Sequence, residues 1–226
     1  MTPSAAPLLI RSLGLRPYQP TWRAMRAFTD ARGPSTPDEL WLLQHPPVYT
    51  LGQAGRAAHL REPGAIDIVA SDRGGQVTYH GPGQLVAYLL LDLRRAALGV
   101  RGLVTLLEGA VVALLEEHGV VAETRRDAPG VYVRGAKVAA LGLRVRRGCC
   151  YHGIALNVDM DLDPFTRIDP CGYPGLAVTQ LRDLGVGLSV EDAGDRLAAL
   201  LAASLGLVPR PVVATDGRAP GDAYTG

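Results

Sequence analysis

Lysine is almost absent from this chain. Of the 23 basic residues among its 226, all are arginine except Lys137. Arginine stays protonated in proteins, whereas lysine can lose its proton and act as a base. A composition that uses arginine wherever only a positive charge is needed therefore makes Lys137 a candidate for proton transfer. The alternative is that one surface lysine has survived by chance.

Other scarcities exclude several classes of function. Aromatic residues make up 5% of the chain and the formal net charge is +1. The sequence therefore lacks the stacking platforms and the basic excess typical of proteins that bind nucleic acids or membrane surfaces. No apolar stretch approaches the ~20 residues that span a bilayer, and the N-terminus lacks the basic start and apolar run of a signal peptide. Three cysteines, an odd number, favour a reducing compartment. We expect a cytoplasmic protein without nucleic-acid or membrane partners.

The hydrophobic patterns predict one α+β domain. Residues 8–210 form the expected domain, with mobile tails at 1–7 and 211–226. Strands are predicted at 8–13, 39–44, 48–51, 66–70, 76–79, 84–93, 131–133, 137–145 and 150–158. Helices are predicted at 21–31, at 100–118 and from 189 onward. Many strands, few helices and no regular βαβ alternation indicate mixed, largely antiparallel sheets with packed helices.

Glycines bracket a short strand-like segment between residues 73 and 84. Glycine lets the backbone approach a ligand closely, and the segment between the glycines contains Thr78, Tyr79 and His80. One interpretation is a substrate-binding wall with exposed amides. The other is an ordinary hairpin between two tight turns. The segment does not match the G-x-G-x-x-G pattern of dinucleotide-binding proteins.

The segment around Lys137 nearly matches a phosphate-binding P-loop but fails in detail. Ala136 separates Gly135 from Lys137, and Val138 stands where the hydroxyl residue that holds magnesium belongs. The residues after Lys137 also favour a strand, whereas a P-loop is followed by a helix. We therefore expect no P-loop here.

Cys171 lies between Pro170 and Gly172, a setting typical of a constrained, accessible loop. Buried structural cysteines are usually inert, so Cys171 is a better nucleophile candidate than Cys149 or Cys150, which fall in a predicted strand. The alternative is an incidental free thiol.

A zinc site is the obvious competitor for these cysteines. Soft ligands are available at Cys149, Cys150, His152 and Cys171. However, there is no C-x₂-C pair, and adjacent strand residues point to opposite faces. We expect no metal.

Four motifs in order resemble one family. They are the Arg-Gly-Gly-x₄-His-Gly-Pro-Gly-Gln segment at 73–84, Lys-Val-Ala-Ala-Leu-Gly-Leu-Arg at 137–144, Tyr-His-Gly-Ile-Ala-Leu-Asn-Val-Asp at 151–159, and Asp-Pro-Cys-Gly at 169–172. The chain resembles the lipoate-biosynthesis octanoyltransferases, the octanoyl-[acyl carrier protein]–protein N-octanoyltransferases. The resemblance implies the fold of the lipoate and biotin protein ligase catalytic domains. It implies octanoyl transfer from octanoyl-acyl carrier protein, without a cofactor, to a lysine of a lipoyl domain. The implied acceptors are the lipoyl domains of 2-oxoacid dehydrogenase complexes and the glycine cleavage H protein.

The resemblance also assigns roles to residues. It implies a catalytic pair, Cys171 and Lys137, in which Cys171 forms an acyl-thioester. It implies substrate-binding walls made of Arg73, Gly74, Gly75, Gln76, Val77, Thr78, Tyr79, His80, Ala140, Leu141, Gly142, Gly153, Ile154 and Ala155. His80 and His152 fall within or beside these walls, and His80 either orients a reacting group or is a hydrogen-bonded structural histidine. Cys149 and Cys150 receive no role.

Two other functions compete with the transferase. An ATP-dependent lipoate or biotin ligase with the same fold would need the lysine and a nucleotide site but no nucleophilic cysteine. A non-catalytic module that binds a carrier protein would behave the same after Cys171→Ala. Cys171 and the failed P-loop favour the transferase.

Overall fold

Strands dominate the computed structural model, which describes residues 6–170 and 175–212. The larger sheet contains β1 (Pro7–Leu15), β2 (Asp38–Gln44), β6 (Gln84–Asp92), β7 (Glu123–Thr124), β8 (Gly130–Val133), β9 (Ala136–Arg146), β10 (Cys149–Asn157) and β11 (Val208–Pro211). The smaller sheet contains β3 (Val48–Leu51), β4 (Asp67–Ala70) and β5 (Val77–His80). The helices are α1 (Tyr18–Ala31), α2 (Val100–Glu116), α3 (Asp163–Thr166) and α4 (Val190–Leu205), with 3₁₀ turns η1 (Ala57–His59) and η3 (Arg182–Leu184).

Most neighbouring strands are antiparallel. The larger sheet has the order β11-β1-β2-β6-β10-β9-β8-β7, in which only the pairs β11–β1 and β1–β2 are parallel. In the smaller sheet, β3 is parallel to β4 and antiparallel to β5. The predicted α+β class with mixed, largely antiparallel sheets is therefore confirmed.

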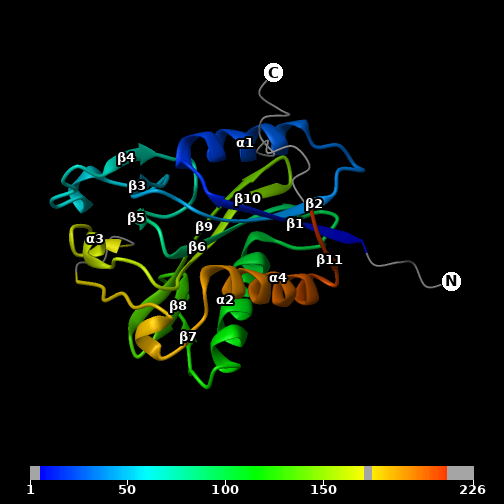
Figure 1. Ribbon diagram of the computed structural model, residues 1–226. Coiled ribbons are helices and arrows are strands. Elements are labelled where there is room, and N and C mark those ends of the chain that lie inside the picture. The colour runs from blue at the N-terminus through cyan, green and yellow to red at the C-terminus, as the bar shows by residue number, and fades with distance from the viewer. Residues whose placement is uncertain (1–5, 171–174, 213–226) are drawn as a thin grey trace.

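The larger sheet is covered by helices on both faces. Along β6, Leu85, Ala87, Leu89 and Leu91 belong to the core cluster that also contains the apolar faces of α2 and α4. The residues between them, Val86, Tyr88 and Leu90, belong to the cluster that contains α1. Figure 1 shows α1 on one side of the sheet and α2 and α4 on the other. This burial on both faces explains why β6 is an almost continuous apolar run rather than an alternating one.

The two long predicted helices follow their sequence signals. The buried side of α2 repeats at three- and four-residue intervals, and Ser189 caps α4 by accepting a hydrogen bond from the Asp192 amide at 3.0 Å. Gly206 ends α4 in the left-handed conformation, at φ 65°. Among the described residues, no helix is long and apolar enough to cross a membrane.

The C-terminal strand was not predicted. β11 pairs with β1 in parallel, and all four of its residues are exposed. An exposed edge strand has no buried face to create an alternating apolar pattern, so the sequence carried no signal for it. Within the predicted tails, residues 1–5 and 213–226 lie outside the described part of the chain.

Candidate functional site

The three predicted wall segments meet at one cavity. Gly153, Ile154 and Ala155 on β10 pair with Gly142, Leu141 and Ala140 on β9, and the segment that leads into β5 lies against them. The cavity is narrow, with a volume of about 50 Å³, and it opens to solvent. Its lining consists of Tyr18, Arg73, Gly75, Gln76, Val77, Thr78, His80, Val86, Tyr88, Ala140, Leu141, Gly142, His152, Gly153, Ile154 and Ala155.

Two predicted wall residues do not line the cavity. The Gly74 amide donates a hydrogen bond to the Leu143 carbonyl at 2.8 Å, which joins this segment to β9. Tyr79 packs in a separate core cluster, with its ring centroid 5.5 Å from those of Tyr49 and Phe165. Gly74 therefore joins the wall to β9, and Tyr79 anchors β5 in the neighbouring core cluster.

Arg73 fixes the loop before β5 through several hydrogen bonds. Its guanidinium donates to the Thr50 hydroxyl at 3.0 Å, to the Gln76 carbonyl at 2.7 Å and to the Gly74 carbonyl at 3.0 Å. The side chain is buried. Close backbone approach assists this arrangement, since a Cβ on Gly52 would lie 2.3 Å from the Gly75 carbonyl oxygen. Arg73 thus donates to backbone carbonyls and to the Thr50 side chain within the protein.

Buried rings form the floor of the cavity. The His80 ring stacks on Tyr18 at 5.8 Å and lies 5.7 Å from His45, which in turn bonds the Tyr88 hydroxyl at 2.8 Å. Burial lowers the pKa of His45 to about 4, and it also lowers the pKa values of His80 and His152. These histidines are therefore uncharged at neutral pH, which makes the floor suitable for an apolar ligand.

The buried histidines predict acid sensitivity. The unfolded chain has histidine pKa values of about 6.5, above the folded value for His45, so the unfolded state binds more protons as pH falls. Stability should be complete above pH ~6.5 and decline toward pH ~4, by about 3 kcal/mol for His45 alone. Urea unfolding at several pH values measures this slope. His45→Gln should flatten it, whereas exposed His118→Gln should not; equal slopes in all three proteins would contradict the prediction.

A half-buried carboxylate orients His152. Asp72 accepts hydrogen bonds from Trp22 at 2.7 Å, from His152 Nε2 at 3.1 Å and from the Tyr151 hydroxyl. Burial alone would raise the pKa of Asp72, but these hydrogen bonds hold it well below its usual value. His152 has a left-handed backbone, with φ 65°, and its Nδ1 has no hydrogen-bond partner among the described residues. Strained residues of this kind cluster at functional sites.

Lys137 is a buried residue of β9 and not an exposed surface lysine. Its side chain is 3% exposed. The Nζ donates to the Pro129 carbonyl at 3.1 Å and lies 5.0 Å from the Tyr132 ring centroid. The strand after Lys137 is the one predicted, and it agrees with the rejection of a P-loop.

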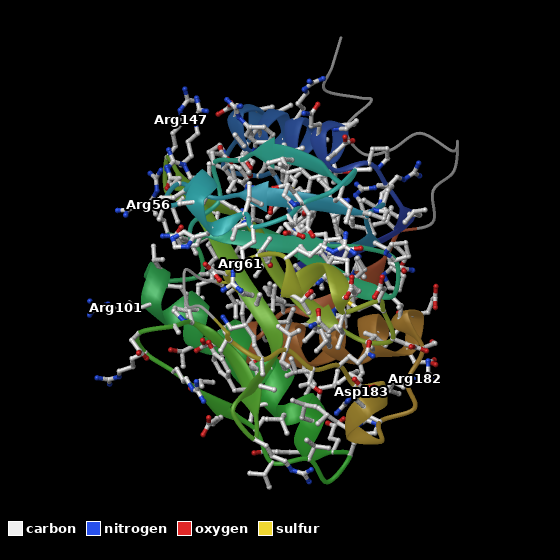
Figure 2. The ribbon with its side chains drawn as sticks, turned by 90° about the vertical axis from the view of Figure 1, so that its left-hand side faces the viewer. Arg56, Arg61, Arg101, Arg147, Arg182 and Asp183 are labelled. Atoms are coloured by element: carbon white, nitrogen blue, oxygen red, sulfur yellow. The ribbon has the colours of Figure 1, made fainter. Side chains whose placement is uncertain are left out.

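Cys171 lies outside the described residues, but the chain on both sides of it is anchored. Before it, Asp169 accepts a bond from Arg61 and its amide donates to the His59 carbonyl at 2.9 Å. Figure 2 labels Arg61 on the face that is turned toward the viewer. After it, the Ala177 carbonyl accepts a bond from the Lys137 amide at 2.8 Å, and the Thr179 amide donates to the Lys137 carbonyl at 2.9 Å.

The other two cysteines are buried on β10, as predicted. Both are free thiols, and burial raises both their pKa values, that of Cys150 to about 12. A thiol that stays protonated is a poor nucleophile. The structure therefore leaves Cys149 and Cys150 in the core.

Sequence reasoning missed several residues of this site. Tyr18, Val86 and Tyr88 line the cavity, and Asp72 supports it from outside. The available signal was Tyr88, because a tyrosine in an otherwise apolar strand needs a hydrogen-bond partner when buried.

Comparison with known proteins finds relatives that agree with one another in family and in activity. The model of the lipoyl protein ligase A/B catalytic domain matches residues 17–202. An octanoyltransferase of Alkalilimnicola ehrlichii is 65% identical over 182 residues, which are 80% of this chain and 85% of that protein. An octanoyltransferase of Aeromonas hydrophila is 58% identical over 215 residues, or 91% and 92% of the two chains.

Solved structures share the fold at low identity. A lipoate-protein ligase A bound with ATP has a TM-score of 0.74 at 16% identity, covering 98% of this chain and 92% of that one. A bipartite lipoate protein ligase of Thermoplasma acidophilum, described together with its E2 lipoyl domain, has 0.74 at 15%, covering 97% and 90%. A biotin protein ligase of Aquifex aeolicus has 0.55 at 12%, covering 89% and 70%.

Proposed function

Since the chain belongs to the lipoyl protein ligase A/B catalytic-domain family and is an octanoyltransferase acting in protein lipoylation, we propose that it transfers the octanoyl group through a thioester on Cys171 with Lys137 as acid and base. One observation carries this proposal. The single lysine of the chain is buried, and its backbone is bonded to Ala177, six residues after Cys171.

In the first step, the Cys171 thiolate attacks the carbonyl carbon of the octanoyl thioester. A carbon–sulfur bond forms to Cys171, the bond to the carrier thiol breaks, and Lys137 supplies the proton that the leaving thiolate takes. One thioester replaces another, so the step is close to energy-neutral and needs no ATP.

In the second step, the acceptor amine attacks the acyl-Cys171 carbonyl. An amide bond forms, the Cys171 thiolate leaves, and Lys137, neutral after the first step, takes the proton that the amine loses. Lys137 thereby returns to its charged form, which completes the cycle.

The cavity supplies the acyl site in this proposal. The predicted substrate-binding residues that line it come from three segments, and its floor rings are uncharged at neutral pH. An octanoyl chain would lie between the β9–β10 pair and the segment before β5. Gly142 and Gly153 allow the close packing of these walls, since a Cβ on Gly142 would lie 3.0 Å from the Gly74 carbonyl oxygen and a Cβ on Gly153 would lie 2.0 Å from that of Ala87.

The proposed donor and acceptors are those that the family resemblance implies. We take octanoyl-acyl carrier protein as donor, and as acceptors the lipoyl domains of 2-oxoacid dehydrogenase complexes and the glycine cleavage H protein. One structural neighbour is described together with a lipoyl domain, which supports this class of acceptor. We propose that the enzyme works with these partners in the cytoplasm.

The ATP-dependent ligase is the rival, and a donor assay separates the two. Purified enzyme should transfer octanoate from octanoyl-acyl carrier protein to a lipoyl domain in nucleotide-free buffer, and added ATP should leave the rate unchanged. Free octanoate with ATP is the matched control and should give no product. Transfer that requires ATP would overturn the proposal.

A further inference from the structure

One peptide group in the structure is hydrogen-bonded at both ends to buried charged side chains. The Gly130 amide donates to Glu108 Oε1 at 2.8 Å. The carbonyl of the same peptide, that of Pro129, accepts from Lys137 Nζ at 3.1 Å. Glu108, the 129–130 peptide and Lys137 therefore form a continuous chain from carboxylate to ammonium.

Glu108 is an unusual residue for its position. It lies on the buried side of α2, next to Leu107, and is 7% exposed. Burying a carboxylate costs free energy unless it is paired. Burial raises the pKa of Glu108, whereas the Gly130 amide and the charge of Lys137 lower it. The compensating partners thus lie on the strand pair that carries Lys137.

The geometry at Gly130 brings Lys137 onto this peptide. Gly130 has φ 148°, and a Cβ there would lie 2.9 Å from Lys137 Cε and 3.0 Å from Nζ. Only a residue without a side chain lets the ammonium approach so closely. The β8–β9 register also shifts at this point, since Val131 pairs with Ala139 but Tyr132 pairs with Lys137. Such bulges redirect side chains near active sites.

We propose that Glu108 is a positioning residue for acyl transfer, which holds Lys137 in place and in its charged form through the 129–130 peptide. A carboxylate on the N–H side polarises the peptide and strengthens its carbonyl as an acceptor, because hydrogen bonds in series reinforce one another. The negative charge also favours the ammonium form directly. This role rests on the proposed function of Lys137.

Other groups also face the ammonium. The Tyr132 ring on β8 lies 5.0 Å from Nζ, and the Arg125 guanidinium lies 4.2 Å from the centroid of the same ring. Arg125 is itself paired with Glu123, whose carboxylate accepts a hydrogen bond from it at 2.9 Å. The proposal concerns the contribution of Glu108 alone, so its test changes only that charge.

The single lysine allows a direct test. Protein labelled with ¹³C at lysine Cε gives one lysine resonance, that of Lys137, whose shift can be followed with pH. Glu108→Gln keeps an oxygen that can accept from Gly130 but removes the charge. We expect the titration midpoint of Lys137 to fall by about one pH unit. Glu116→Gln, an exposed charge on the same helix, is the matched control and should leave it unchanged.

Kinetics supply the second readout. A one-unit change in proton affinity alters a proton-transfer equilibrium tenfold, so kcat of Glu108→Gln should fall about tenfold with little change in KM for the donor. Glu108→Asp, which keeps the charge, should restore the midpoint. A midpoint unchanged in Glu108→Gln, or a shifted midpoint with unchanged kcat, would overturn the proposal.

The unsubstituted enzyme covers the case in which Glu108→Gln does not fold. In that protein, the chemical shift of the Gly130 amide nitrogen should change with pH at the same midpoint as the Lys137 resonance. If this amide shift does not respond, the proposed coupling through the 129–130 peptide is wrong. Failure of the proposed function looks different, since it would remove the octanoyl adduct of Cys171 in the unsubstituted enzyme while these titrations remained coupled.

Discussion

Incubation with octanoyl-acyl carrier protein should add one octanoyl group to the enzyme, on Cys171, and Cys171→Ser should lose both the adduct and the transfer activity. A serine hydroxyl is far less acidic than a thiol, and a lysine amine is too weak a base to ionise it fully. We expect kcat to fall by a factor on the order of 10³ or more, as for other essential nucleophiles. Intact-mass measurement after rapid quenching detects the adduct, and peptide mapping locates it.

The chain offers its own control for this substitution. Cys149→Ser changes a thiol that is buried on β10 and whose pKa is raised by that burial. It should form the adduct and transfer octanoate at the normal rate. An unmodified enzyme that still turns over, or an adduct on Cys149, would contradict the covalent mechanism.

The electrostatic free energy that one nearby lysine supplies is enough to activate the thiol. A free thiol has a pKa of about 8.5, and lowering it to about 7 requires about 2 kcal/mol. An ammonium ~4 Å away supplies about 4 kcal/mol at an effective dielectric constant near 20, before desolvation. No third member of a catalytic triad is needed on these grounds.

The sequence predicts those parts of the fold that bury a periodic face. The helical repeat of Leu103, Leu107 and Val111 and the apolar run of β6 each determine their element, because their side chains contact the core directly. β11 has no such face, since its residues are exposed and its backbone pairing with β1 determines it. The pairing of β11 at the sheet edge depends on where the rest of the sheet places β1. No local sequence pattern encodes that position.

In the site, the residues that the sequence predicts best are the reacting and substrate-binding ones, and the residues that hold them in position are harder to predict. The rarity of lysine indicated Lys137, and the family motifs identified three segments that line one cavity in the structure. Glu108 and Asp72 were not found, because each is an ordinary acidic residue in the sequence. Their significance arises only where tertiary packing brings the Gly130 amide to the buried carboxylate of Glu108, and the His152 ring to the half-buried carboxylate of Asp72.

Lys137→Arg should separate the two halves of the reaction. Arginine keeps a positive charge that can stabilise the Cys171 thiolate, but it cannot supply the proton that the leaving carrier thiolate takes, which must then come from solvent. Acylation should therefore persist at a reduced rate. Arginine cannot lose a proton in the protein, so it cannot take the proton that the acceptor amine releases. The acyl-enzyme should therefore accumulate while product formation falls by a factor on the order of 10³.

The structure also explains why acylation should be slower and not normal. Lys137 Nζ fits between the Pro129 carbonyl and the Tyr132 ring, with Gly130 close against its side chain. A planar guanidinium is larger than an ammonium and must shift away from this position. Lys137→Ala removes charge and base together, so it should lose the adduct as well as the product. Quenched time courses that follow adduct and product separately distinguish the two variants, and full transfer by Lys137→Arg would refute the role of Lys137 as a base.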